Sequence, residues 1–200
     1  MDKIEKYKEI ILEQAFASFI QKGPKNFTVD ALAVELGMSK KTIYGIFPTK
    51  EILIENIFEN FTASIRKEFE EIINSEENPI IKFNTIIDSL TNKFVLIPIT
   101  SLMELKIRYP LIWERLANFR EEMSKNFAQF FKDAQKQGLA KSDIDMEKAA
   151  SIFLYIINNT IQPEFFIAND IAPSDGMKLL VRMITEGLLT EEGVVLRNKT

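Results

Sequence analysis

Two residue types with versatile chemistry, cysteine and histidine, are missing from this 200-residue chain. Without cysteine there is no disulfide, no thiolate nucleophile and no cysteine-ligated zinc site. Without histidine there is no Ser-His-Asp triad, and the commonest metal ligand is absent. Glycine is scarce, with seven residues and no Gly-x-Gly pair, so dinucleotide fingerprints and phosphate-binding loops are missing too. These absences argue against an enzyme, and they predict no metal site and no bound cofactor.

No apolar run in the sequence is long enough to span a membrane. The most apolar stretch, residues 94–99, is far shorter than the roughly 20 residues that a spanning helix needs. The N-terminus alternates charges from Asp2 to Lys6 instead of leading into an apolar segment, unlike a secretory signal. Together with the absence of cysteine, these features predict a cytoplasmic protein that does not bind membranes.

Basic residues are fewer than acidic residues and are unevenly distributed along the chain. The chain has 25 basic and 29 acidic side chains, a formal net charge of −4. The segment from Lys22 to Lys50 reverses this balance, with five lysines against two acidic residues. A basic segment on an acidic chain suggests a locally bound anionic partner, although chance alone gives fluctuations of this size.

Apolar residues recur at helical spacing along almost the whole chain, and no alternating strand pattern competes with them. The first stripe runs from Ile4 through Ile11 to Phe19, and Gly23-Pro24 ends that helix. The tail after Thr190 is expected to be frayed. We predict an all-α protein with three short helices followed by a larger bundle. The expected helices cover about residues 4–22, 29–36, 40–47, 50–74, 79–96, 98–108, 110–137, 146–161 and 174–189.

The basic segment has the outline of a helix-turn-helix, two short helices joined by a glycine turn. Thr28 and Ser39 are suited to cap these helices, and Gly37 tolerates the left-handed backbone of the turn. Ala33 is small where the helices approach each other, and Ile43 fills the space between them. This spacing predicts a helix-turn-helix motif at about residues 28–47.

The second helix of this motif turns polar residues outward. Its inward residues are Ile43, Ile46 and Phe47, while Gly45 has no side chain with which to contact a base. The outer side chains suit the major groove of DNA, and the alternative is an ordinary helical corner with a solvated face. The outer residues are Lys40, Lys41, Thr42, Tyr44 and Gly45.

These residues resemble the DNA-binding domain of the TetR-type transcriptional regulators. The resemblance is carried by residues 27–33 and 37–44, and by the Tyr-x-x-Phe-x-x-Lys pattern that ends at Lys50 before Glu51 and Leu53. With Ala15-Phe16 and Gly23 upstream, it covers about residues 8–55. The family implies a three-helix DNA-binding domain, here residues 1–48. It also implies a helical bundle for ligand binding and dimerisation, here residues 49–200.

The resemblance also implies roles for individual side chains. Lys40, Lys41 and Thr42 would approach base edges, and Tyr44 and Lys50 would hold phosphates. For Tyr44 the alternative is packing against the first helix. No arginine precedes residue 66, so Lys41 is expected to replace the usual reader of guanine. The two capping residues would also touch the DNA backbone. The full set of DNA-contacting residues that the resemblance implies is Thr28, Ser39, Lys40, Lys41, Thr42, Tyr44 and Lys50.

In the bundle, the resemblance implies a ligand cavity and a homodimer. Large apolar residues in the middle segments are candidates to line a cavity for a small apolar ligand, or else they are plain core: Phe83, Phe94, Met103, Trp113, Phe119, Phe127 and Tyr155. Glu104 and Arg108, four residues apart, are candidates for a polar ligand contact or for a surface ion pair. The apolar faces of helices 146–161 and 174–189 predict an isologous four-helix dimer interface through Ile152, Ile156, Leu180 and Ile184.

The predicted function is ligand-responsive, DNA-binding transcriptional regulation. The chain is expected to be a repressor that binds a palindromic operator as a homodimer and is released by a small apolar ligand. The alternative is a helical small-molecule-binding protein whose helical corner binds no DNA. An enzyme that works with carboxylates and Tyr44 alone is disfavoured, because histidine, cysteine and glycine-rich loops are all missing.

Overall fold

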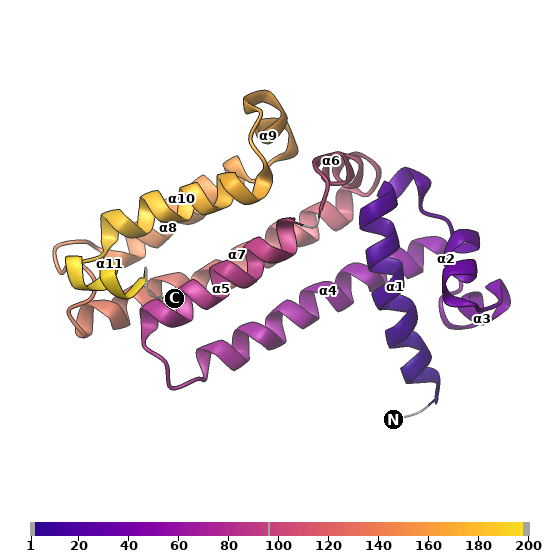
Figure 1. The fold of residues 1–200 in the computed structure, drawn as a ribbon, viewed down its shortest axis with the longest axis horizontal. Coiled ribbons are helices and arrows are strands. Elements are labelled where there is room, and N and C mark those ends of the chain that lie inside the picture. The colour runs from indigo at the N-terminus through magenta and orange to yellow at the C-terminus, as the bar shows by residue number, and fades with distance from the viewer. Residues whose placement is uncertain (1–2, 96, 198–200) are drawn as a thin grey trace. The chain divides into compact units, whose positions relative to one another are not determined.

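A computed structural model of the chain describes residues 3–95 and 97–197, which form eleven helices and no β-strand (Figure 1). The all-α prediction is confirmed. Within the described residues, no helix combines the length and apolar character needed to cross a membrane. The helices are α1 (Lys3–Asn26), α2 (Val29–Leu36), α3 (Lys40–Ile46), α4 (Lys50–Ile73), α5 (Pro79–Val95), α6 (Ile99–Arg108), α7 (Pro110–Lys136), α8 (Met146–Thr160), α9 (Pro163–Asn169), α10 (Pro173–Leu188) and α11 (Glu191–Arg197).

The chain divides into two compact units that do not follow the order of the sequence. The N-terminal unit contains the residues up to Ile65 together with Thr100–Arg115, and the C-terminal unit contains Arg66–Ile99 and Leu116–Thr200. Nearly all of α6 and the start of α7 therefore pack with the first three helices. The functional division between residues 48 and 49 stays a prediction, because these units are defined by packing alone.

Aromatic side chains form the centre of the N-terminal unit. Phe19 and Phe27 are fully buried and meet edge to face, with ring centroids 5.4 Å apart. Phe58 of α4 approaches Phe19 at 5.5 Å, and Tyr109, between α6 and α7, approaches it at 6.0 Å. Helices α1 to α3 alone bury too little surface for stability, so α4 and α6 complete this core.

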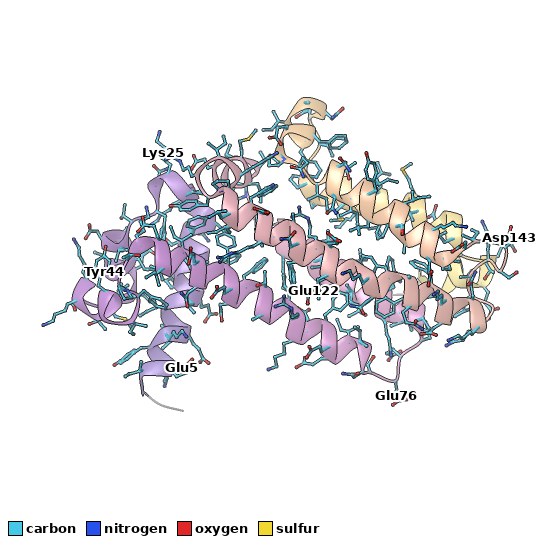
Figure 2. All side chains as sticks on the ribbon, turned by 180° about the vertical axis from the view of Figure 1, so that it is seen from behind. Glu5, Lys25, Tyr44, Glu76, Glu122 and Asp143 are labelled. Carbon is cyan, nitrogen blue, oxygen red and sulfur yellow. The ribbon has the colours of Figure 1, made fainter. Side chains whose placement is uncertain are left out.

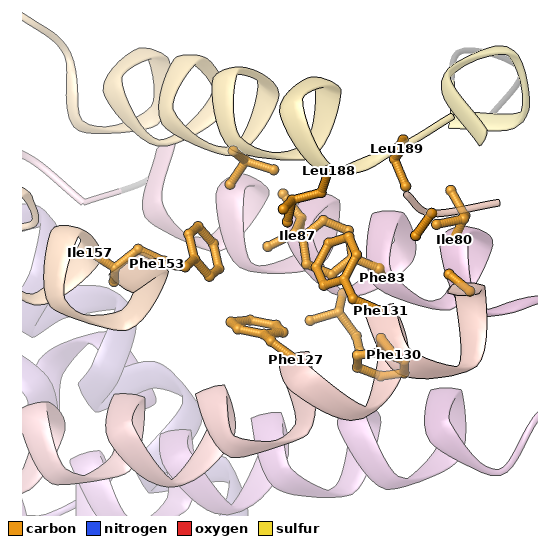
Figure 3. Packing of buried hydrophobic residues seen from close by; sticks show 14 of the residues in the cluster. Ile80, Phe83, Ile87, Phe127, Phe130, Phe131, Phe153, Ile157, Leu188 and Leu189 are labelled. Carbon is orange, nitrogen blue, oxygen red and sulfur yellow. The ribbon is translucent and has the colours of Figure 1, made fainter. Parts of the chain in front are cut away.

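The core of the C-terminal unit is built on aromatic rings from α5, α7 and α8 (Figure 3). Phe83 lies 5.5 Å from Phe127 and 5.0 Å from Phe131, and Phe127 lies 5.3 Å from Phe153, all measured between ring centroids. Leu188 at the end of α10 covers these rings, and both α10 and α11 pack on α5. Each aromatic ring buries a large apolar area, so this cluster supplies much of the unit's stability.

Two helices of the C-terminal unit differ from the sequence-based prediction. The tail after Thr190 was expected to be frayed, but it forms α11. The amide of Thr190 donates to the carbonyl of Leu139 at 3.1 Å, which ties the start of α11 to the loop after α7. The short helix α9, with Pro163 in its first turn, was also missed. A seven-residue helix is marginal by itself and depends on tertiary packing, which here buries Phe166.

Candidate nucleic-acid interface

Side-chain caps and one left-handed glycine shape the α2–turn–α3 segment. The Thr28 hydroxyl accepts a hydrogen bond from the Ala31 amide at 3.2 Å, and the Ser39 hydroxyl accepts one from the Thr42 amide at 3.1 Å. Gly37 has φ 61°, and its amide and that of the next residue donate to carbonyls at the end of α2. This is the usual glycine termination of a helix, so the sequence correctly predicted both caps and the turn.

Helix α3 has one buried side and one exposed side. Ile43 is fully buried and Phe47, its C-cap, is nearly so. The outer face carries two lysines, a hydroxyl and a phenol, all exposed, with Tyr44 at 42% exposure (Figure 2). We call this set the α3 outer face: Lys40, Lys41, Thr42 and Tyr44.

The lysines of the segment differ in how far their charge is neutralised within the protein. Lys40 forms an ion pair with Asp30 of α2, and Lys22 forms one with Glu35. Asp30 and Glu35 are the two acidic residues between Lys22 and Lys50, and each neutralises one lysine of that segment. Among the described residues, none forms an ion pair with Lys41. Among the described residues, its ammonium is therefore the positive charge of the α3 outer face that no acidic side chain neutralises.

Glu35 fixes α2 against α1 through a small polar cluster. Its carboxylate accepts hydrogen bonds from Lys22, from the Gln14 side chain at 3.1 Å and from the Ser18 hydroxyl at 3.4 Å. These hydrogen bonds, that from Lys22 first, lower the pKa of Glu35 below its ordinary value. The cluster therefore holds a charged group in place at neutral pH, and α2 with it.

Lys50, expected to hold a phosphate, has partners inside the protein. Its ammonium donates to the carbonyl oxygen of Phe27 at 2.6 Å and lies 5.6 Å from the centre of the Phe27 ring. The side chain is half-buried. Lys50, the first residue of α4, thus contacts the segment before α2, and its predicted phosphate contact stays a prediction.

Contacts between α6 and the end of α1 were not foreseen from the sequence. The Ser101 hydroxyl donates to the Ile20 carbonyl at 2.8 Å, and the Lys25 amide donates to the Glu104 carboxylate at 2.8 Å. Glu104 was considered as a partner for Arg108 or a ligand, but it takes the Lys25 amide. That amide lies just after the helix break at Gly23-Pro24, where donors without an intrahelical partner are expected.

Several candidates for cavity lining are packed in the core of the C-terminal unit. Phe83 and Phe127 contact each other there, and both are nearly fully buried. Phe119 is buried beneath the guanidinium of Arg66, whose central carbon lies 5.1 Å from the ring centre. The side chain of Phe94 lies outside the described part of the chain.

The other candidates lie elsewhere. Met103 and Trp113 are half-buried in the N-terminal unit, and Tyr155 is 70% exposed on α8. The structure also has an apolar pocket of about 150 Å³ beside α9, which shares no residue with the predicted set. It is lined by Thr160, Ile161, Phe165, Phe166, Ile171, Gly176, Met177, Leu179, Leu180 and Met183.

The four residues predicted for the dimer interface lie on α8 and α10. Ile152 is 61% exposed, and the other three, Ile156, Leu180 and Ile184, are half-buried. Beside them, large apolar side chains are exposed on the same two helices. We call this set the α8–α10 apolar face: Ile152, Tyr155, Leu179 and Met183.

Comparison with known proteins identifies the N-terminal segment. Residues 11–57, which include α2, α3 and the start of α4, match the model of the family described as bacterial regulatory proteins, tetR family. In this segment the chain is similar to the TetR family. A relative, the HTH-type transcriptional regulator YvaF of Bacillus subtilis, is 25% identical over 183 residues, which cover 91% of this chain and 95% of YvaF.

Solved structures share the fold of this chain over nearly its whole length. A TetR regulator from Chloroflexus aurantiacus is 18% identical with a TM-score of 0.65, covering 94% of this chain and 99% of its own. A regulator from Saccharomonospora viridis, solved in complex with choline, is 16% identical with a TM-score of 0.70, covering 94% and 100%. These likenesses show a shared fold, and the match of residues 11–57 supports DNA-binding transcriptional regulation.

The described residues also contain no cluster of acidic side chains that could hold a metal ion.

Proposed function

We propose that this chain is a TetR-type regulator, a homodimeric repressor that binds a palindromic operator and is released by a small, mainly apolar ligand. The observation that carries the proposal is the α3 outer face. Its helix buries Ile43 against the rest of the unit and exposes two lysines, a hydroxyl and a phenol to an incoming duplex. An exposed helix of this composition fits the major groove.

Within that face, Lys41 is the best candidate to read a base. Lys40 is held by Asp30, and the Thr42 hydroxyl shares a hydrogen bond of 2.9 Å with the Ser39 hydroxyl. Lys41 is free of such contacts among the described residues, so its ammonium can reach a guanine edge without breaking an ion pair. Tyr44 contacts phosphate in this proposal, with the two capping hydroxyls near the DNA backbone.

The α8–α10 apolar face supports the homodimer. Exposed isoleucine, leucine, methionine and tyrosine side chains on two neighbouring helices form the kind of apolar patch that marks association sites. The same patch on a second copy gives an isologous interface of four helices. A dimer also presents two copies of α3, and a single seven-residue helix reads too few bases for specificity.

A ligand in the segments from Pro79 to Gly138 would reach α1 through α6. These segments are rich in large apolar side chains, which suit a mainly apolar ligand. Helix α6 is continuous in the chain with α5 and α7, yet Ser101 and Glu104 bind it to α1. A displacement of α6 therefore acts on the helix that supports α2 and α3.

The first experiment separates this proposal from a helical ligand carrier that binds no DNA. Binding of fluorescent duplexes of random sequence is measured at low salt, and a preferred site is then selected from a random library. We expect salt-sensitive binding and a selected site with two-fold symmetry. Lys41→Ala should weaken binding to the selected site, whereas Lys67→Ala, an exposed lysine of α4 in the C-terminal unit, should not. Absence of duplex binding by the wild-type protein would support the carrier instead.

A further inference from the structure

Five of the seven glycines of the chain are explained by the fold itself. Three of them have a positive φ, and at the other two an added Cβ would lie 2.8 Å or less from a neighbouring atom. The five are Gly23, Gly37, Gly138, Gly176 and Gly193. Gly45 and Gly187 differ from them, because neither has a positive φ and no described atom lies within 4 Å of an added Cβ. Nothing in the described part of the protein therefore requires a glycine at these two positions.

The glycine at residue 45 weakens helix α3. This helix has only seven residues, and Gly45 is exposed in its last turn. Glycine is less favourable than alanine in a helix, because its backbone loses more conformational freedom on folding. A helix this short has little stability of its own to lose. A residue that weakens the fold, and that the fold does not explain, indicates a function.

Helical geometry places Gly45 on the outermost ridge of α3. Successive residues of a helix are about 100° apart around its axis, so the residues two positions before and after the fully buried Ile43 point to nearly the opposite side. These residues are Lys41 and Gly45, which are four positions apart and therefore neighbours on the helix surface. The part of α3 farthest from the core thus carries one lysine followed by backbone without a side chain.

The dimensions of the major groove make the depth of a bound helix sensitive to this ridge. The groove is about 12 Å wide, and a helix with its side chains is about 10–12 Å across. A side chain on the ridge that faces the bases holds the helix away from them, whereas glycine permits a close approach of the backbone to a ligand. With glycine at residue 45, α3 can lie deep enough in the groove for the Lys41 ammonium to reach a base edge.

We propose that Gly45 is a specificity-determining residue, whose missing side chain lets α3 approach the floor of the major groove and brings Lys41 to a base edge. The inference rests on the proposed function, because it concerns how α3 binds an operator. It predicts that one substitution has two opposite effects. A side chain at residue 45 stabilises the free protein and weakens its binding to the operator.

The first test measures stability and operator affinity on the same variants. Gly45→Ala should raise the Tm by about 1–4 °C. It should also weaken binding to the selected site by about threefold, as the base contact of Lys41 is partly lost. Gly45→Leu, with a larger side chain that also favours a helix, should keep the Tm at or above that of the wild type and weaken binding by more than about tenfold.

Gly187→Ala is the matched control. Gly187 is also exposed in the last turn of its helix, α10, with open space around an added Cβ. The substitution should raise the Tm by a similar amount and leave operator affinity unchanged, in a dimer verified by light scattering. An equal loss of affinity in Gly187→Ala and Gly45→Ala would show that stabilisation alone weakens binding, and it overturns the role of Gly45.

A double variant tests whether the effect acts through Lys41. If a side chain at residue 45 keeps Lys41 from its base, Gly45→Leu should cost little further affinity in a protein that already carries Lys41→Ala. If Gly45→Leu does not fold, the same comparison is made with Gly45→Ala. Unchanged or tighter binding by the Gly45 variants, or equal losses with and without Lys41, overturns the role of Gly45 while the proposed function stands. A wild-type protein that binds no duplex overturns the proposed function itself, and this role with it.

Discussion

Gly23 lies in a backbone conformation that essentially excludes other residues. It interrupts α1 with φ 76° and ψ 156°, a region populated almost only by glycine. A Cβ added at this position would lie 3.3 Å from the Glu104 carboxylate. That carboxylate cannot simply withdraw, because it accepts the Lys25 amide at 2.8 Å. Gly23→Ala therefore combines backbone strain with pressure on the contact between α1 and α6.

The backbone strain and the displaced carboxylate together set the stability expected to be lost in Gly23→Ala. Holding a residue with a side chain in this region costs about 1–3 kcal/mol. Displacing the carboxylate weakens a hydrogen bond to a charged group, worth about 1.5–3 kcal/mol when lost completely. We expect Gly23→Ala to reduce the free energy of unfolding by about 2–4 kcal/mol, equivalent to a Tm lower by roughly 5–15 °C in a chain of this size.

Two other glycines of the same unit are matched controls. Gly37 has φ 61° with no atom near an added Cβ, so Gly37→Ala costs only the left-handed backbone, about 1–2 kcal/mol. Gly45 is helical and also faces open space, so Gly45→Ala should stabilise by about 0.5–1 kcal/mol. Urea unfolding followed by fluorescence of Trp113, the single tryptophan, reports on this unit directly.

The order of the three variants is the decisive result. If Gly23→Ala is no more destabilising than Gly37→Ala, the contact with Glu104 does not constrain the backbone. The double variant with Glu104→Ala measures this coupling, because removing the carboxylate should relieve the steric part of the Gly23→Ala cost and leave the backbone part. Strict additivity of the two substitutions would also refute the reasoning.

Three further predictions concern DNA, assembly and pH. Lys41→Ala should reduce discrimination at one base pair of each half-site by about 1–3 kcal/mol, measured by competition with operator variants, and equal loss on all sequences would contradict a base contact. Ile152→Glu should give a folded monomer by light scattering and circular dichroism, because the side chain is 61% exposed; a persistent dimer would place the interface elsewhere. Glu35 has a lowered pKa, so its stabilisation is complete above its ordinary value of 4.5 and disappears as the pH falls through the folded-state pKa. Glu35→Gln should therefore flatten the loss of stability in acid, and an unchanged pH profile would show that the cluster contributes nothing.

The helix-turn-helix was predictable because its determinants are local. A capping hydroxyl before each helix and one glycine between them specify where α2 and α3 begin and where α2 ends. The inward position of Ile43 follows from helical spacing, and the structure buries it completely. Once the inward residues of α3 are known, the remaining residues of this helix must form its exposed face. Such features need no knowledge of the rest of the chain.

The short helices of the C-terminal unit depend on distant partners and escaped prediction for that reason. Seven residues contain less than two complete apolar repeats, so the pattern in α9 or α11 is no stronger than chance. What orders α11 is the hydrogen bond of Thr190 to Leu139, which is 51 residues away in the chain. The hydrogen bond from Lys50 to the Phe27 carbonyl was unforeseen for the same reason, since the two residues are 23 positions apart in the chain.

The assignment of α6 to the N-terminal unit has an energetic consequence for regulation. Helix α6 is joined covalently to α5 and α7, but two hydrogen bonds, from Ser101 to Ile20 and from Lys25 to Glu104, hold it to α1. If a ligand moves α6, either these bonds break or α1 follows. One neutral hydrogen bond and one to a carboxylate are together worth about 2–4 kcal/mol, of the same order as the 1–3 kcal/mol that typically couples two sites in an allosteric protein. In the proposed response to a ligand, a contact of this strength would transmit a movement of α6 to the helix that supports α3, and a more tightly bound ligand would break it.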